Sequence, residues 1–153
     1  MRIEELADSY EKATEEFLAA VEKVSASDLD KAPEGEWSAR QIIHHQAHAD
    51  AYCLTRIIQV VSEPGTAVRS FSESALVASD VLAYSTTPID SSIALLKAVR
   101  SEALRIIRAA KDSDLSRSCQ HSELGEFTLE AMIVRFTEHP AGHARQLLET
   151  IAQ

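Results

Sequence analysis

The stretch WSARQIIHHQAHAD, residues 37–50, marks the start of a long helix and carries three of the six histidines in the chain. Ser38 and Gln41 stand three residues apart, the spacing of a capping box, in which each side chain satisfies a free backbone N–H of the first turn. Trp37 and Ile42 occupy the two positions of a hydrophobic staple, which fixes the angle at which the chain enters a helix. The sequence therefore predicts a helix that begins directly after Ser38.

Apolar spacing extends this helix and predicts three others. The helix from Ser38 runs to about Ser62, because the Pro-Gly pair at 64–65 ends it. The last helix begins near Thr128 and continues to the C-terminus, with Pro140 inside it. Two further stripes repeat at steps of three and four residues, as on the buried face of a bundle helix. They comprise Ile3, Leu6, Tyr10, Ala13, Phe17, Ala20 and Val24 in the first helix, and Ile89, Ile93, Leu96, Val99, Ala103, Ile107 and Ala110 in the third.

Four such helices predict an all-α fold, a four-helix bundle, formed by residues 1–153 as a single domain. We expect a short extra helix around residues 70–83, between the second and third long helices. Residues 112–127 (DSDLSRSCQHSELGEF) are interpreted as a loop, and no stretch is a convincing strand. Connections of more than a dozen residues are more often functional than idle.

Composition excludes several classes of function. The formal net charge of −9, without any run of basic residues, argues against binding nucleic acid. No apolar run approaches the length of a membrane span, and no signal-peptide pattern follows Met1. Cys53 and Cys119 lack CxxC spacing, so we interpret them as two reduced thiols. We expect a cytoplasmic protein that binds a small molecule, with no nucleic-acid or membrane partner.

Five of the six histidines fall in two short windows, and the second window holds an HxxxH pair. His139 and His143 project within the apolar stripe of the last helix, between Met132 and Phe136 in angle. Side chains four residues apart are neighbours on a helix, so two rings at this spacing can converge on one metal ion. The alternative is that each histidine forms its own hydrogen bonds inside the bundle.

The second helix offers a third ligand. His45 lies at the edge of that helix's apolar stripe and is therefore well placed to meet another helix. His44 and His48 share a face with polar residues, so we expect them on a solvated or interface-facing side, and whether either joins the site stays open. Three histidines from two helices leave a fourth coordination position free, as in catalytic sites. The sequence contains no HExxH, Glu-x-x-His, P-loop or Gly-x-Ser-x-Gly motif to support another chemistry.

Pro140 directly follows His139 and interrupts the hydrogen bonding of the last helix. It indicates either a kink that aims His139 or a break into two shorter helices. We favour the kink, because apolar periodicity resumes in register at Leu147 and Ile151.

These motifs resemble the DinB/YfiT-like superfamily, small four-helix-bundle proteins with a three-histidine metal site. The resemblance rests on DLDKAPEGEWSARQIIHHQAHAD (residues 28–50) and DLSRSCQHSELGEFTLEAMIVRFTEHPAGHARQL (residues 114–147). It implies that His45, eight residues after the Trp, is the first ligand and that His139 and His143, followed by Gln-Leu, are the other two. The chain departs from the family pattern at His48, where an acidic residue is frequent, and at Pro140.

The resemblance implies a metal-dependent enzyme that holds Zn²⁺ or Ni²⁺ and activates a water molecule or a low-molecular-weight thiol. The reaction expected is hydrolysis or thiol S-transfer on a small-molecule substrate. The first alternative is a non-catalytic, dimeric metal-binding protein of a stress response, and the second is a bundle without metal. We expect a homodimer, since small bundles with long apolar stripes often dimerise. The candidate pocket residues are Tyr10, Tyr52, Arg56 and His121; the alternative, which we favour for each of them, is a structural or exposed position.

Overall fold

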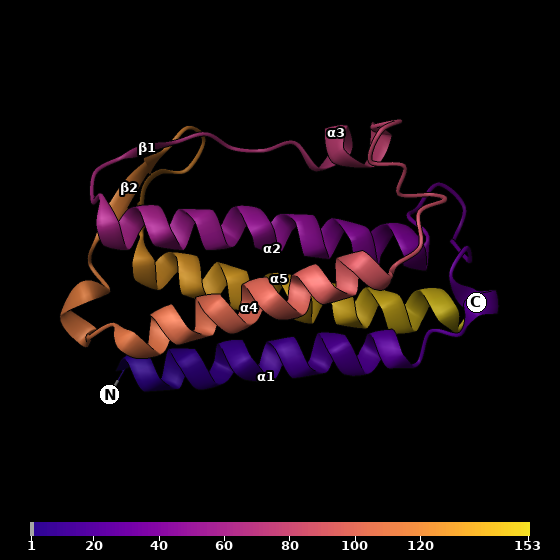
Figure 1. Cartoon of the computed structure of the whole chain (residues 1–153), viewed down its shortest axis with the longest axis horizontal. Helices are drawn as coiled ribbons and strands as arrows, with labels where there is room; N and C mark the ends of the chain where they lie inside the picture. The colour runs from indigo at the N-terminus through magenta and orange to yellow at the C-terminus, as the bar shows by residue number, and fades with distance from the viewer. Residues whose placement is uncertain (1) are drawn as a thin grey trace.

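The computed structural model describes residues 2–153 and has four long helices with a small sheet at one end (Figure 1). The long helices are α1 (Arg2–Glu22), α2 (Ala39–Ser62), α4 (Asp90–Ala109) and α5 (Leu129–Ile151). The shorter elements are α3 (Glu73–Ala78), β1 (Ala67–Val68), β2 (Ser118–His121), β3 (Gly125–Thr128) and two single turns of 3₁₀ helix at Ala26–Asp28 and Asp112–Asp114. The predicted four-helix bundle and its short extra helix are confirmed. Across residues 2–153, no helix has the length and apolar character needed to cross a membrane.

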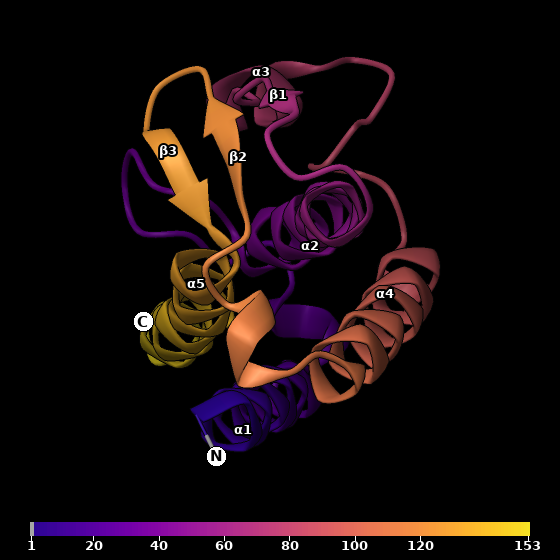
Figure 2. The same ribbon diagram turned by 90° about the vertical axis from the view of Figure 1, so that its left-hand side faces the viewer.

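The four long helices form a bundle in which α1 and α2 each pack against both α4 and α5. Seen end on, they occupy the corners of a square (Figure 2). Helices α1 and α5 run in one direction, and α2 and α4 run in the other (Figure 1). Because α2 and α4 are parallel, residues 63–89 must travel back along the whole bundle between them. This crossover segment carries β1 and α3 along the outside of α2.

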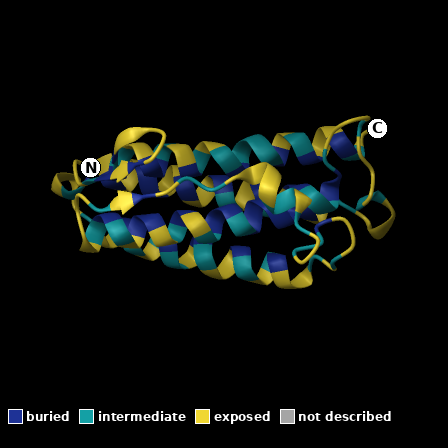
Figure 3. Ribbon diagram, turned by 90° about the horizontal axis from the view of Figure 1, so that it is seen from above, coloured by how far each residue is buried: buried dark blue, intermediate teal, exposed yellow. Residues whose placement is uncertain are grey.

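Local signals in the sequence explain where two of these helices begin. The Gln41 N–H donates to Ser38 Oγ at 3.2 Å, and the Ser38 N–H donates to Gln41 Oε1 at 2.8 Å, so the capping box is confirmed. Trp37 and Ile42 belong to the same apolar cluster, as expected for a staple. Thr128 caps α5 by accepting the N–H of Ala131 at 3.1 Å. Buried residues then line the inner faces of the helices, and exposed residues cover the outside (Figure 3).

A charged side chain lies at the centre of this core. Arg100 on α4 is only 1% exposed and donates to Asp50 Oδ1 on α2 at 2.7 Å. It also donates to the carbonyl oxygens of Tyr10 on α1 and Phe136 on α5, each at 3.3 Å, and its guanidinium lies 3.9 Å from the centre of the Tyr10 ring. Gln46 donates to the second oxygen of Asp50 at 2.9 Å. One guanidinium therefore joins all four long helices.

Helix α5 continues through Pro140 from Leu129 to Ile151, so the alternative of two shorter helices is wrong. Proline has no N–H, and the carbonyl four residues earlier, that of Phe136, therefore loses its helical donor. Arg100 donates to this same carbonyl. The buried guanidinium thus offsets the hydrogen bond that Pro140 removes.

The expected loop at residues 112–127 is wrong, because most of it forms a hairpin. Strands β2 and β3 pair in antiparallel fashion, and β1 adds in parallel to β2. Cys119, His121 and Phe127 are buried, and their neighbours along the strands are more exposed, so a two-residue alternation is present. Each strand has only four residues or fewer, too few for that alternation to stand out from a polar loop.

Replacing Arg100 by Met should lower the free energy of unfolding by about 3–5 kcal/mol, because Asp50 would keep a buried charge without a partner. Urea denaturation followed by circular dichroism measures this change. Arg105→Met on the same helix is the matched control, since its ion pair with Glu102 is exposed, and it should leave the midpoint nearly unchanged. Equal midpoints for the two variants would contradict a structural role for Arg100.

Candidate metal centre

The structure brings together the three histidines that the sequence singles out. His45 Nε2 on α2 lies 3.3 Å from His139 Nε2 on α5, and His139 Nε2 lies 3.1 Å from His143 Nε2 one turn further along. Their rings meet nearly edge to face, with centres 4.5–5.2 Å apart. One ring nitrogen from each of the three histidines lies within 4.8 Å of the other two, close enough for all three to hold one metal ion.

The spacing of the three nitrogens fits a divalent cation. Tetrahedral coordination at about 2.0–2.1 Å places two ligand nitrogens about 3.3 Å apart, close to the distances found here. Without a cation, the Nε2 atoms of His45, His139 and His143 face one another, and the protons on these atoms are too few to give each nitrogen a hydrogen bond. Burial, reinforced by repulsion among the imidazoles, lowers the pKa of His45 to about 4 and that of His139 to about 3. Both rings are therefore neutral at pH 7, the state that binds metals.

Neighbouring side chains hold the rings in this orientation. His143 Nδ1 lies 2.7 Å from Gln146 Oε1, an acceptor, so Nδ1 carries the proton and Nε2 keeps its lone pair for the cluster. Trp37 packs beside both His45 and His143, with ring centres 4.8 and 6.4 Å away. His45 Nδ1 is buried and has no hydrogen-bond partner in the part of the chain that the structure describes. The residue pattern around the HxxxH pair thus has a structural reason: the following Gln fixes a tautomer.

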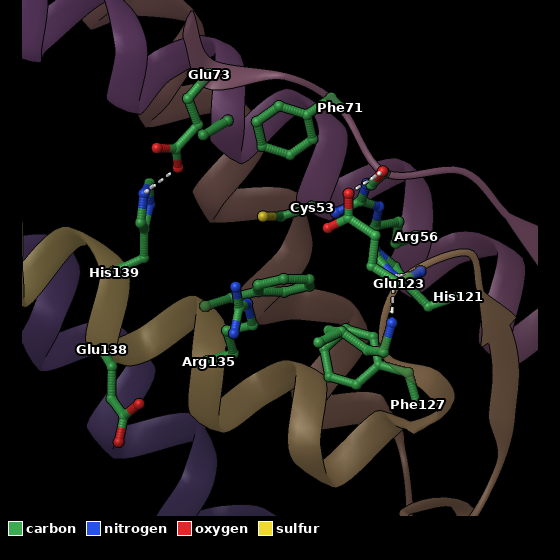
Figure 4. Close-up of a pocket in the computed structure, with 14 residues that line it drawn as sticks. Cys53, Arg56, Phe71, Glu73, His121, Glu123, Phe127, Arg135, Glu138 and His139 are labelled. Atoms are coloured by element: carbon green, nitrogen blue, oxygen red, sulfur yellow. Dashed lines mark hydrogen bonds and ion pairs between the residues drawn. The ribbon is translucent and has the colours of Figure 1, made fainter.

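A carboxylate approaches the cluster from the crossover segment. Glu73 Oε1, at the start of α3, lies 3.6 Å from His45 Nε2 and 3.7 Å from His139 Nε2. Figure 4 shows its carboxylate directed at His139. The Glu73 side chain is 53% exposed, so it reaches the histidines from the open side. Sequence reasoning missed Glu73, because α3 has only six residues and its position over α2 depends on the crossover.

A cavity of about 510 Å³ opens beside Glu73 and His139. Of the pocket residues considered from the sequence, Arg56 and His121 line this cavity, Tyr52 lines a neighbouring depression, and Tyr10 lies in the core. Cys53 also lines the cavity. Burial raises the pKa of its thiol far above the usual range, so Cys53 is not a thiolate nucleophile. Both cysteines are buried and unpaired, as predicted.

The expectation that His44 and His48 lie on a solvated or interface-facing side is wrong, and neither joins the cluster. His44 is 2% exposed, its Nε2 donates to the carbonyl oxygen of Thr87 at 2.9 Å, and its Nδ1 accepts from Ser92 Oγ at 2.7 Å. His48 Nδ1 pairs with the hydroxyl of Tyr84 at 2.5 Å. Both histidines hold the end of the crossover segment against α2. The segment covers the face of α2 that the periodicity of the sequence predicts to be exposed.

The fold and the site define a class of protein, helical bundles in which three histidines cluster beside a cavity. Residues 9–147 match the DinB superfamily, and the chain belongs to it. It is 27% identical to a protein of Bacillus subtilis (strain 168) called "Putative metal-dependent hydrolase YfiT", over 91% of this chain and 78% of YfiT. A relative of Bacillus mycoides (strain KBAB4), also called a "Putative metal-dependent hydrolase", is 23% identical over 94% of this chain and 84% of its own length.

Two solved structures show the same fold. The structure of YfiT from Bacillus subtilis, described as having "an unusual four-helix bundle topology", superposes with a TM-score of 0.81 over 98% of this chain and 87% of YfiT, at 23% identity. The four-helix bundle protein TT2238 superposes with a TM-score of 0.66 over 96% of this chain and 98% of its own, at 19% identity.

The lowered pKa values predict that the metal-free protein loses stability in mild acid. An unfolded histidine titrates near pH 6.5, above the folded values for His45 and His139. Below about pH 6.5 the unfolded state therefore binds more protons, and the free energy of unfolding should fall by up to about 1.4 kcal/mol per pH unit for each of these histidines. Urea denaturation of chelator-treated protein between pH 7 and 5 measures this slope. The slope should become shallower in His45→Asn, and an unchanged slope would contradict the assignment.

Proposed function

We propose that this protein is a metal-dependent hydrolase of small molecules and that His45, His139 and His143 hold a divalent ion, Zn²⁺ or Ni²⁺. The observation that carries the proposal is the convergence of three imidazole nitrogens, 3.1 and 3.3 Å apart, at the edge of a cavity. The names of its relatives support the same chemistry. When bound, the ion supplies Lewis-acid chemistry that makes a water molecule or a thiol nucleophilic near neutral pH.

The residues of the chain supply orientation and a base. Gln146 fixes the His143 ring, and Trp37 packs beside His45. Glu73 Oε1 lies within 3.7 Å of two ligand nitrogens, so a nucleophile seated between the histidines and the cavity lies within its reach. We assign Glu73 as the general base that accepts the proton of that nucleophile.

A low-molecular-weight thiol is the second candidate nucleophile, and the reaction would then be thiol S-transfer. Cys53, which lines the cavity, is held protonated by burial, so a sulfur nucleophile must come from a cosubstrate. The alternative of a non-catalytic metal-binding protein predicts either a filled fourth position or no pocket beside the metal, and the cavity beside His139 argues against it. The homodimer stays a prediction, which sedimentation at several protein concentrations tests.

Elemental mass spectrometry of protein purified without a histidine tag should find about one zinc or nickel ion per chain. His45→Ala and His143→Ala should each lose it, because two imidazoles cannot complete the site. His121→Ala is the control and should keep its metal, since His121 lies outside the cluster. The proposal fails if the parent protein binds neither ion after reconstitution.

The variant Glu73→Gln separates a base from a fourth ligand. Hydrolysis of p-nitrophenyl acetate by the zinc-loaded protein should slow by about 100-fold or more, because the amide cannot accept a proton. The affinity of the variant for Co²⁺ and the visible spectrum of its cobalt-loaded form should match those of the parent protein. Glu138→Gln is the matched control: Glu138 also borders the cavity, but its side chain points away, and its rate should match the parent (Figure 4). A changed cobalt spectrum in Glu73→Gln would make Glu73 a ligand and favour the non-catalytic alternative.

A further inference from the structure

Two arginines from different helices line the cavity without a carboxylate partner. Arg56 on α2 and Arg135 on α5 both border it, together with His139 of the histidine cluster. Neither arginine forms an ion pair with any residue among positions 2–153, although the chain carries more acidic than basic residues. Most of the other arginines do form such pairs, at the surface or with Asp50 in the core.

In the described part of the chain, Arg56 is buried without a negatively charged partner, which is energetically unfavourable for a guanidinium group. Arg56 is only 7% exposed, and its one hydrogen bond within residues 2–153 runs from Nη2 to the carbonyl oxygen of Arg69 at 3.0 Å. Its guanidinium carbon also lies 5.0 Å from the centre of the Phe71 ring. Burial lowers the pKa of Arg56, and the positive charge of Arg135 lowers it further. A buried cation is normally paired, so most of the Arg56 donors lack the anion that their burial calls for.

Arg135 approaches the same space from the opposite wall. It is exposed, and Figure 4 shows its side chain between His139 and Phe127. The carboxylates that border the cavity are otherwise placed: Glu73 faces the histidines, Glu138 points away, and Glu123 accepts a hydrogen bond from Ser70 at 3.1 Å. The two guanidinium groups are therefore free to receive an anion from outside the protein.

We propose that Arg56 and Arg135 form the binding site for an oxyanion group, a carboxylate or a phosphate, of the substrate that reacts at the three histidines. Guanidinium groups present forked donors that match both kinds of oxyanion. The inference rests on the proposed function only in calling this ligand the substrate; the anion site itself does not depend on bound metal.

The rest of the cavity narrows the class of ligand. A volume of about 510 Å³ suits a small organic molecule. Aromatic rings from the crossover segment, β3 and α5, those of Phe71, Phe127 and Phe136, line its walls. The ligand we infer is a compact amphipathic anion, with its charged group on the arginines, an apolar body against these rings and its reactive group near His139.

Three probes of matched shape test this site: 3-phenylpropionate, phenyl phosphate and the neutral 3-phenylpropan-1-ol. Their dissociation constants are measured by NMR titration of the full chain, both after removal of metal by a chelator and after loading with zinc. In both forms we expect at least one anion to bind about tenfold or more tightly than the alcohol, a difference of about 1.4 kcal/mol. The preferred anion shows whether the site takes carboxylates or phosphates.

Variants assign the binding to the two arginines. Arg135→Gln should reduce anion affinity by about tenfold and leave alcohol binding unchanged. Arg56→Lys should also weaken anion binding, because it keeps the charge but loses the fork. Arg145→Gln on the same helix is the matched control, since Arg145 does not border the cavity, and it should bind anions like the parent.

Two results would overturn the inference: equal affinity for the anions and the alcohol, or an equal loss in Arg135→Gln and Arg145→Gln, which would indicate long-range charge alone. Because these titrations include metal-free protein and require no turnover, they separate the two proposals. Anion binding by a protein that cannot be loaded with zinc or nickel would sink the proposed function alone. Metal binding without anion binding would sink this inference alone.

Discussion

The hydrogen-bonding capacity of one buried guanidinium is the constraint on which this bundle depends. Arg100 must find acceptors in a core that excludes water, and it finds them on α1, α2 and α5. Those acceptors lie in register only when the four helices are packed in one arrangement. Asp50, five residues after His45, and Phe136, three residues before His139, both bond to Arg100. The interaction that sets the helix register therefore also brings the two halves of the histidine cluster together.

Much of the fold is readable from the sequence, because helices leave strong periodic signals and their ends have recognisable caps. The limits have particular causes. The third predicted stripe includes Val99, which is half-buried, whereas its neighbour Arg100 takes the core position; hydrophobicity patterns treat a charged residue as exposed. The hairpin at residues 118–128 escapes detection because its strands are short and largely polar.

Some residues of the candidate site can also be predicted from the sequence, and others cannot. His139 and His143 share a helix, so their spacing predicts that they converge, and the family resemblance adds His45. The other parts depend on tertiary structure. The faces of His44 and His48 look exposed until the crossover segment covers them, and Glu73 reaches the cluster only because that segment crosses α2. Residues brought together by a long connection leave no periodic signal in the sequence.

Because α2 and α4 are parallel, the residues of the site come from two parts of the protein, the long helices and the crossover segment. The three histidines stand on α2 and α5, long helices whose buried faces pack closely and tolerate few changes of volume. The crossover segment, residues 63–89, carries Phe71 and Glu73 on the outside of the bundle, where changes in length and sequence cost much less. The histidine cluster and the residues that select its substrate can therefore change independently in evolution. A new crossover segment can give the same three histidines a different reaction while the bundle stays intact.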